Sequence, residues 1–105
     1  MNKKEQLEHF DAAVAKMRGI LESKGDDYAG EDRLSNFKIV GSSVRTSAET
    51  SCLDKISTKV VRLGTLFASE QPPKNESIED SIIDLANYAI LLHMIVSDTR
   101  KNKPF

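Results

Sequence analysis

Three polar side chains interrupt an apolar stretch late in the chain. Their spacing would bring them together on one helical face, where they could bind a ligand or a cation. In EDSIIDLANYAILL, residues 79–92, Asp80, Asp84 and Asn87 fall within about 60° of one another if the stretch is helical, and Tyr88 flanks them. A carboxylate is costly to bury beside an apolar surface unless it has a partner. We expect this stripe to face a ligand pocket, where Asp84 and Asn87 read polar ligand groups and Asp80 is available to a cation.

Two of these side chains could also hold a metal ion. Carboxylates one helical turn apart suit Mg²⁺, which prefers oxygen ligands and keeps several waters beside a substrate phosphate. Asp80 and Asp84 are therefore the candidate metal ligands, and Mg²⁺ is a possible cofactor. The alternative is that these carboxylates pair with Lys or Arg on a neighbouring helix, or that Asp80 helps to start its own helix.

A basic stripe lies in the middle of the chain. Lys55, Lys59 and Arg62 stand at i, i+4 and i+7 and flank an apolar helical face, where they could bind phosphates. A solvated helix face is the commoner explanation of such a pattern. The phosphate hypothesis gains weight because the acidic stripe is expected on a helix that packs nearby.

The segment KGDDYAGEDRLSNF, residues 24–37, offers groups that could hold a base. Tyr28 and Phe37 could stack on it, although Phe37 is as well explained as a core anchor. The polar candidates for ligand binding in this segment are Lys24, Asp26, Arg33 and Asn36. The segment belongs to a longer connection, residues 25–45, between the first two long helical patterns. A connection of that length inside a compact domain is usually functional or disordered, and its apolar residues argue against disorder.

Three long helical patterns must position these groups. They contain Leu7, Phe10, Val14, Met17 and Leu21; then Leu53, Ile56, Val60, Leu63 and Phe67; then Ile78, Ile82, Leu85, Ala89, Leu92 and Val96. We expect the first helix to end at Gly25, and the second to begin at a capping box over Thr46–Glu49 and to stop at the prolines of QPPKN. A short helix is expected over residues 34–40. The prediction is an all-α bundle of three long helices plus a short helix in the long connection, one domain over residues 1–105.

Composition limits the class of protein. The chain has 105 residues and a net charge of −1, so it has no overall positive electrostatic field that would attract nucleic acid. We therefore expect no nucleic acid as a partner. The single Cys52 excludes an internal disulfide and fits a reducing compartment. The charged start is unlike a signal peptide, and the longest apolar run is shorter than a membrane span. We expect a cytoplasmic protein.

The apolar arc of the third long helix is wide, which predicts a homo-oligomer.

Three segments, KGDDYAGEDRLSNFK, DKISTKVVRLGTL and NESIEDSIIDLANYAILL, resemble the phage nucleotide-modification-associated domain family. That small all-α group is distantly similar to MazG-type nucleoside triphosphate pyrophosphatases, and the resemblance covers residues 24–92. It implies a nucleotide ligand, a phage or prophage origin with action in the bacterial host cell, and a MazG-like helical oligomer with sites between subunits.

The acidic residues depart from the MazG pattern. Such enzymes hold Mg²⁺ with E-x-x-E on one helix and E-x-x-D on the next. Asp84 matches the last aspartate, but Ser81 stands at the preceding glutamate position, and Asp54 is the only acid in LDKISTKVV. We therefore favour a protein that sequesters a nucleotide or a nucleotide-derived immune signal, cyclic or of ADP-ribose type, and so counters anti-phage defence. The alternative is a Mg²⁺-dependent nucleoside triphosphate pyrophosphohydrolase of phage nucleotide metabolism. A helical oligomer without a ligand explains the long polar connection poorly.

Overall fold

The computed structural model describes residues 1–28, 31–70 and 77–101. These ranges contain four helices and no strand: α1 (Lys3–Tyr28), α2 (Ser35–Ser43), α3 (Ala48–Ala68) and α4 (Ile78–Lys101). The predicted all-α class, with three long helices and a short one in the connection, is confirmed. The short helix covers the predicted residues 34–40 almost entirely and continues for three further residues.

Two predicted helix boundaries were wrong. α1 does not end at Gly25 but continues to Tyr28. A glycine ends a helix by adopting positive φ, and no described glycine does so. The cap of α3 is Ser47 rather than Thr46, because Ser47 Oγ accepts a hydrogen bond of 3.0 Å from the Thr50 backbone N–H. α3 ends at Ala68, and the expected QPPKN stop lies outside the described residues.

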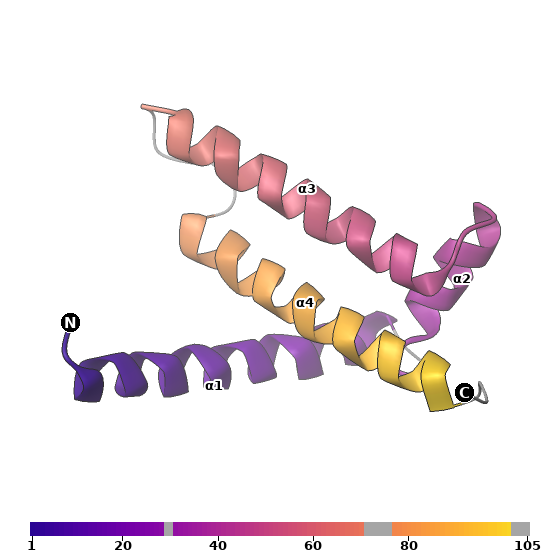
Figure 1. Cartoon of the computed structure of the whole chain (residues 1–105), viewed down its shortest axis with the longest axis horizontal. Coiled ribbons are helices and arrows are strands. Elements are labelled where there is room, and N and C mark those ends of the chain that lie inside the picture. Colours follow the sequence, from indigo (N-terminus) through magenta and orange to yellow (C-terminus); the bar gives the residue numbers. More distant parts are fainter. Residues whose placement is uncertain (29–30, 71–76, 102–105) are drawn as a thin grey trace.

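α3 and α4 run side by side, α2 closes one end of this pair, and α1 crosses α4 on its other side (Figure 1). The core lies where α2, α3 and α4 meet. Its buried residues are Leu34, Phe37, Cys52 and Ile95. The Phe37 ring meets the Tyr88 ring edge-on, with centroids 6.5 Å apart. Phe37 is therefore a core anchor, the second of the two roles that its position in the sequence suggested.

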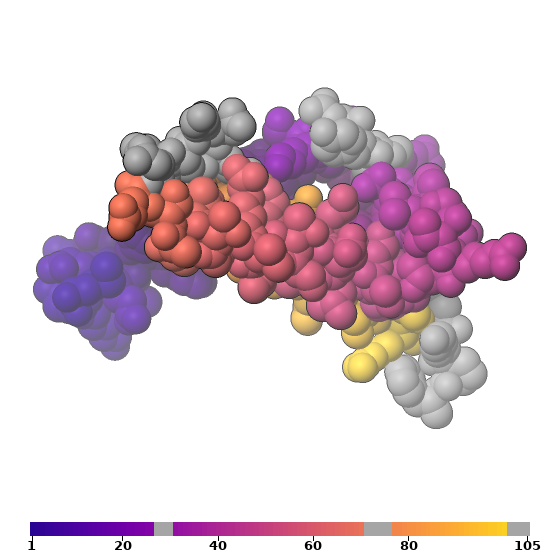
Figure 2. All heavy atoms as spheres, turned by 90° about the horizontal axis from the view of Figure 1, so that it is seen from above, coloured from indigo at the N-terminus to yellow at the C-terminus, as the bar shows by residue number. Residues whose placement is uncertain are grey.

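The first half of α1 makes little contact with the other helices. Leu7, Phe10 and Val14 are 50%, 62% and 41% exposed, although their spacing predicts a buried face. Figure 2 shows the N-terminal residues of α1 standing apart from the body formed by α2, α3 and α4. Within one chain, the apolar stripe along the first half of α1 is therefore largely left exposed.

α4 is the most apolar of the helices. By length and composition alone, Ile78–Arg100 could cross a membrane, although polar and charged residues interrupt its apolar runs, as the sequence already showed. Within this fold α4 packs against α1 and α3, and its polar residues Asp84 and Asn87 contact those helices.

Candidate functional site

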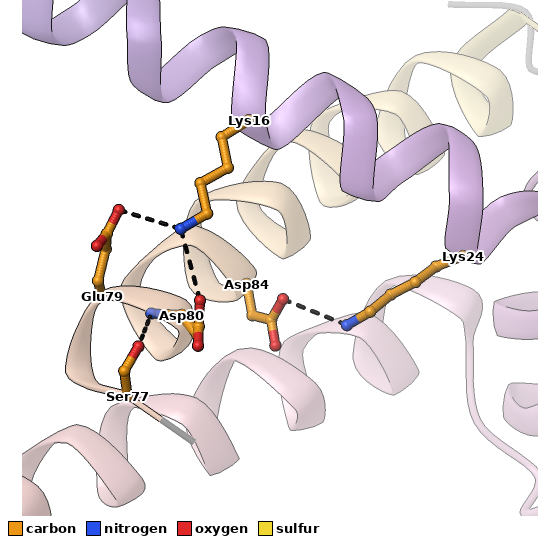
Figure 3. A network of polar contacts seen from close by, with 6 residues as sticks. All are labelled: Lys16, Lys24, Ser77, Glu79, Asp80 and Asp84. Atoms are coloured by element: carbon orange, nitrogen blue, oxygen red, sulfur yellow. Dashed lines mark hydrogen bonds and ion pairs between the residues drawn. The ribbon is translucent and has the colours of Figure 1, made fainter. Parts of the chain in front are cut away.

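Asp84 joins three helices through its two carboxylate oxygens. Asp84 Oδ1 lies 3.3 Å from Lys24 Nζ on α1, a contact drawn in Figure 3, and Asp84 Oδ2 lies 3.1 Å from Lys59 Nζ on α3. The Asp84 side chain is only 14% exposed. Opposite charges at these distances offset the cost of taking the carboxylate out of water. The alternative considered for Asp84, a pair with basic residues of neighbouring helices, is the arrangement in this structure.

Asp80 lies one turn earlier on α4 and has different partners. Its carboxylate is 3.5 Å from Lys16 Nζ, which also lies 3.1 Å from Glu79 Oε1 (Figure 3). The Ser77 hydroxyl, followed by the Lys16 ammonium, holds the pKa of Asp80 below its usual value. The Glu79 carboxylate, followed by that of Asp80, raises the pKa of Lys16. Lys16 was not singled out from the sequence, because it belongs to the charged face of α1.

The predicted metal pair is therefore divided between two sets of lysines. Asp80 faces Lys16, and Asp84 faces Lys24 and Lys59. In the described ranges no three His, Cys, Asp or Glu side chains gather in a way that could hold a metal ion. An ion at Asp84 would have to displace at least one ammonium group.

Asn87 fastens α4 to α1. Its side-chain Nδ2 donates a hydrogen bond of 3.0 Å to the Met17 carbonyl oxygen, and the residue is only 7% exposed. This bond satisfies one donor of a buried amide, which is otherwise expensive to place beside apolar residues. Asn87 also lines the cavity described next, so its amide has both a structural partner and a face towards open space.

A cavity of about 670 Å³ opens between the C-terminal half of α1, the start of α2, and the facing sides of α3 and α4. Its volume lies in the range of about 300–1,000 Å³ that is usual for small-molecule sites. The lining residues are Ile20, Leu21, Glu22, Lys24, Gly25, Arg33, Leu34, Asn36, Phe37, Lys55, Asp84, Asn87, Tyr88, Leu91 and Met94.

Most of the predicted ligand-binding residues meet in this cavity. Those that line it are Lys24, Arg33, Asn36, Lys55, Asp84, Asn87 and Tyr88. They come from all four helices and, for Arg33, from the connection between α1 and α2. Their positions in the sequence are up to more than 60 residues apart, and they unite the three separate patterns found there. The lining combines cationic, amide and aromatic side chains with an apolar wall from α1 and α4.

The cations of the lining differ in how they are held. Lys24 pairs with Asp84, and Arg33 Nη1 lies 2.8 Å from Asp26 Oδ1 while its Nη2 donates to the Glu22 carbonyl oxygen at 3.3 Å. Lys55 makes no recorded ion pair with any described residue, so it can meet an anionic ligand without breaking an internal contact.

Four predicted site residues do not line the cavity. Lys59 reaches it only through its ion pair with Asp84, and Arg62 lies half-buried one turn further along α3. Asp26 holds Arg33 from the exposed side, and Asp80 belongs to the Lys16 cluster. The side chain of Tyr28 lies outside the described residues.

Sequence reasoning missed part of the lining. Glu22 and Gly25 on α1 line the cavity beside the expected Lys24, as do Leu91 and Met94 on α4. Leu91 and Met94 follow Asn87 at four and seven residues, so continuing the polar stripe along the same face would have found them. Gly25 was interpreted as a helix end, which hid its place in the site.

Comparisons with known proteins give one finding. Neither curated proteins nor solved structures give a match to this chain. The comparison with protein families matches residues 24–95 to nucleotide modification associated domain 1. The matched region begins at Lys24 and ends at Ile95, so it contains every residue that lines the cavity except Ile20, Leu21 and Glu22. Since it spans well over half of the sequence, the chain belongs to the nucleotide modification associated domain 1 family.

Proposed function

We propose that this protein binds and sequesters a nucleotide or a nucleotide-derived signal, cyclic or of ADP-ribose type, and so counters a bacterial defence against phage. The observation that carries the proposal is the composition of the cavity. Lys24, Arg33 and Lys55 supply cations for phosphates, and Tyr88 supplies an aromatic surface for a base. Asn36 and Asn87 add amides that can read base or ribose edges.

The charge of the lining supports an anionic ligand. The lining contains three cations, Lys24, Arg33 and Lys55, and two carboxylates, Glu22 and Asp84. The net charge of the lining is therefore +1, whereas that of the whole chain is −1. Glu22 is also engaged by Arg18, whose Nε lies 3.1 Å from Glu22 Oε1. A local cationic surplus inside a concave site attracts phosphate groups although the whole chain has almost no net field.

The contacts of Asp84 favour binding over hydrolysis. A Mg²⁺-dependent pyrophosphohydrolase needs carboxylates that can hold the ion beside the triphosphate. Asp84 is the carboxylate that matches the MazG-type motif, and both of its oxygens hold lysine ammonium groups. Pyrophosphohydrolysis is therefore the second candidate, and the experiment below distinguishes the two.

The same proposal includes assembly and origin. We place the protein in a MazG-like homo-oligomer, with sites between subunits, encoded by a phage or prophage and acting in the cytoplasm of the host. The exposed apolar side chains of the first half of α1, Leu7, Phe10 and Val14, support assembly because a single chain leaves them in water. A partner subunit would cover them.

The experiment is to incubate the purified protein with nucleoside triphosphates, cyclic dinucleotides and ADP-ribose derivatives, with and without Mg²⁺. The protein is then washed and denatured, and the compounds that it releases are analysed. Intact recovery of a ligand supports sequestration, and a converted product supports the pyrophosphohydrolase. Lys55→Ala is expected to weaken retention about tenfold, the equivalent of one charge-assisted hydrogen bond. The matched control is Lys4→Ala, which removes an exposed lysine of α1 far from the cavity. Failure to retain any compound would contradict the proposal.

A further inference from the structure

Gly25 and Arg33 make a contact that only glycine permits. Gly25 lies inside α1 and lines the cavity, and the Arg33 guanidinium lies directly over its Cα atom. A Cβ atom added to Gly25 would lie 2.5 Å from Arg33 Cζ and closer still to Nη2. Real Cβ atoms do not approach other atoms so closely, so a side chain at position 25 would displace the guanidinium.

Two polar contacts fix the guanidinium in this place. Arg33 Nη1 lies 2.8 Å from Asp26 Oδ1, and Arg33 Nη2 donates to the Glu22 carbonyl oxygen at 3.3 Å. Both partners belong to α1, on either side of Gly25. The plane of the guanidinium is thus held against the last turns of the helix. A guanidinium carries five N–H donors, and these two contacts leave three for a ligand in the cavity.

The conformation of Gly25 does not explain why a glycine stands there. Its φ is not positive, so it does not use the freedom that normally selects glycine. Glycine is among the least favourable residues in a helix interior, and alanine would be better there on propensity alone. α1 contains a second glycine, Gly19, around which an added Cβ meets nothing within 4 Å. What distinguishes Gly25 from Gly19 is the guanidinium that occupies the place of its side chain.

We propose that Gly25 is a positioning residue that seats Arg33 at the rim of the cavity, where the remaining N–H donors of the guanidinium bind a phosphate group of the ligand. This inference rests on the proposed nucleotide-binding function and names the phosphate-recognising group of that site. Arginine suits this task because its planar fork can meet two phosphate oxygens at once, provided that the plane is held in place. Gly25, Glu22 and Asp26 hold it.

The test compares Gly25→Ala with the matched control Gly19→Ala, each in the wild-type chain and in Arg33→Ala. The first readout needs no ligand: the NMR signal of the Arg33 Nε–H group, with a nuclear Overhauser effect to the Gly25 Hα protons in the wild type. Gly19→Ala should leave this signal unchanged. Gly25→Ala should move it to the position of a solvated arginine, and both variants should keep the melting temperature of the wild type or raise it.

The second readout is the binding of inorganic pyrophosphate, measured by calorimetry. We expect Gly25→Ala and Arg33→Ala each to raise the Kd about tenfold, and the double variant to lose no more than either alone. Gly19→Ala should bind as the wild type does. Arg33→Lys should restore little, because an ammonium keeps the charge but not the fork.

Three results would overturn the inference: equal behaviour of Gly25→Ala and Gly19→Ala, a loss from Gly25→Ala that persists without Arg33, or no pyrophosphate binding by the wild type. None of them decides the proposed function, which depends on retention of nucleotides by the wild-type chain. Conversely, pyrophosphate binding that depends on Gly25 and Arg33, with no nucleotide retained, would support the phosphate site and contradict sequestration of a nucleotide.

Discussion

Lys59 and Asp84 form an ion pair between α3 and α4 in which Lys59 Nζ lies 3.1 Å from Asp84 Oδ2 and the two side chains are only 18% and 14% exposed. Both residues were predicted to contact the ligand, one through a phosphate and the other through a base or ribose. In the folded chain they contact each other. Lys24 completes the arrangement from α1, so the Asp84 carboxylate holds three helices beside the cavity.

Asp84→Asn is expected to lower the free energy of unfolding by about 1–3 kcal/mol, because it removes the charge that Asp84 places beside the poorly solvated ammonium of Lys59. Urea denaturation of the variant measures the change. Glu8→Gln is the control, since the Lys4–Glu8 pair is fully on the surface and its loss should change stability by less than about 0.5 kcal/mol. In a double-mutant cycle, Asp84→Asn and Lys59→Ala should cost less together than the sum of the two single changes. Additive costs would show that the pair contributes nothing.

Asn87→Ala is expected to loosen α1 from α4. The variant loses the hydrogen bond to the Met17 carbonyl, worth about 1 kcal/mol, and leaves a small space in a buried position. Hydrogen exchange should therefore rise in the second half of α1 while α3 keeps its protection. Asn36→Ala is the matched control, because this exposed amide lines the same cavity but makes no hydrogen bond that the structure records among the described residues. If Asn87→Ala and Asn36→Ala show the same hydrogen exchange in the second half of α1, a docking role for Asn87 would be contradicted.

Acid should weaken the contact of α4 with α1 and the contact of Asp32, just before α2, with Lys38 of α2. The pKa of Asp80 is lowered by Ser77 and Lys16, and the pKa of Asp32 is lowered by Lys38 and by the Leu34 backbone N–H. A carboxyl group whose pKa is lower in the folded state stabilises the fold above its unfolded value of 3.8, and this contribution is lost as the pH falls through the folded value. The urea midpoint should therefore decrease below about pH 4.

Asp80→Asn should reduce that acid dependence, because the amide cannot titrate. Urea midpoints between about pH 2 and 6 measure the slope of the acid limb in wild type and variant. Asp11→Asn is the control, since Asp11 is exposed and makes no ion pair that the structure records among the described residues. An acid limb of the same slope in Asp80→Asn and wild type would remove Asp80 from this account.

Phe10→Glu is expected to reduce assembly without unfolding the chain. The Phe10 side chain is 62% exposed, so a charge there costs the isolated chain little, whereas it would be buried against apolar residues in an oligomer. Sedimentation at micromolar concentration should show the wild type as an oligomer and the variant shifted towards the monomer. Glu8→Gln, on the charged side of the same helix, should sediment as the wild type does. A monomeric wild type would contradict the proposed assembly.

The sequence by itself determined the helices and their order. Apolar residues at intervals of three and four predicted α1, α3 and α4, because a helix must bury one face of its surface, and this period depends on local geometry alone. The boundaries were less certain, since they depend on single contacts. Ser47 and Thr46 can both cap α3, and only the geometry of the folded chain selects Ser47.

The sequence also indicated the cations, the amides and the tyrosine of the cavity, because such side chains are distinctive beside apolar patterns. It did not determine which of them face the ligand and which face one another. Lys55 and Lys59 are one turn apart on α3 and look alike in the sequence. Only the packing of α4 places Asp84 against Lys59 and leaves Lys55 at the cavity.

Gly25 shows the same limit most clearly. Its sequence context suggested a helix end, whereas the folded chain uses the missing Cβ to admit Arg33 from eight residues away. Partner choice for a charge, and the space that a glycine leaves open, are decided when separate helices come together. A periodic pattern shows which face of a helix is apolar, but tertiary structure alone decides whether that face is covered and by what.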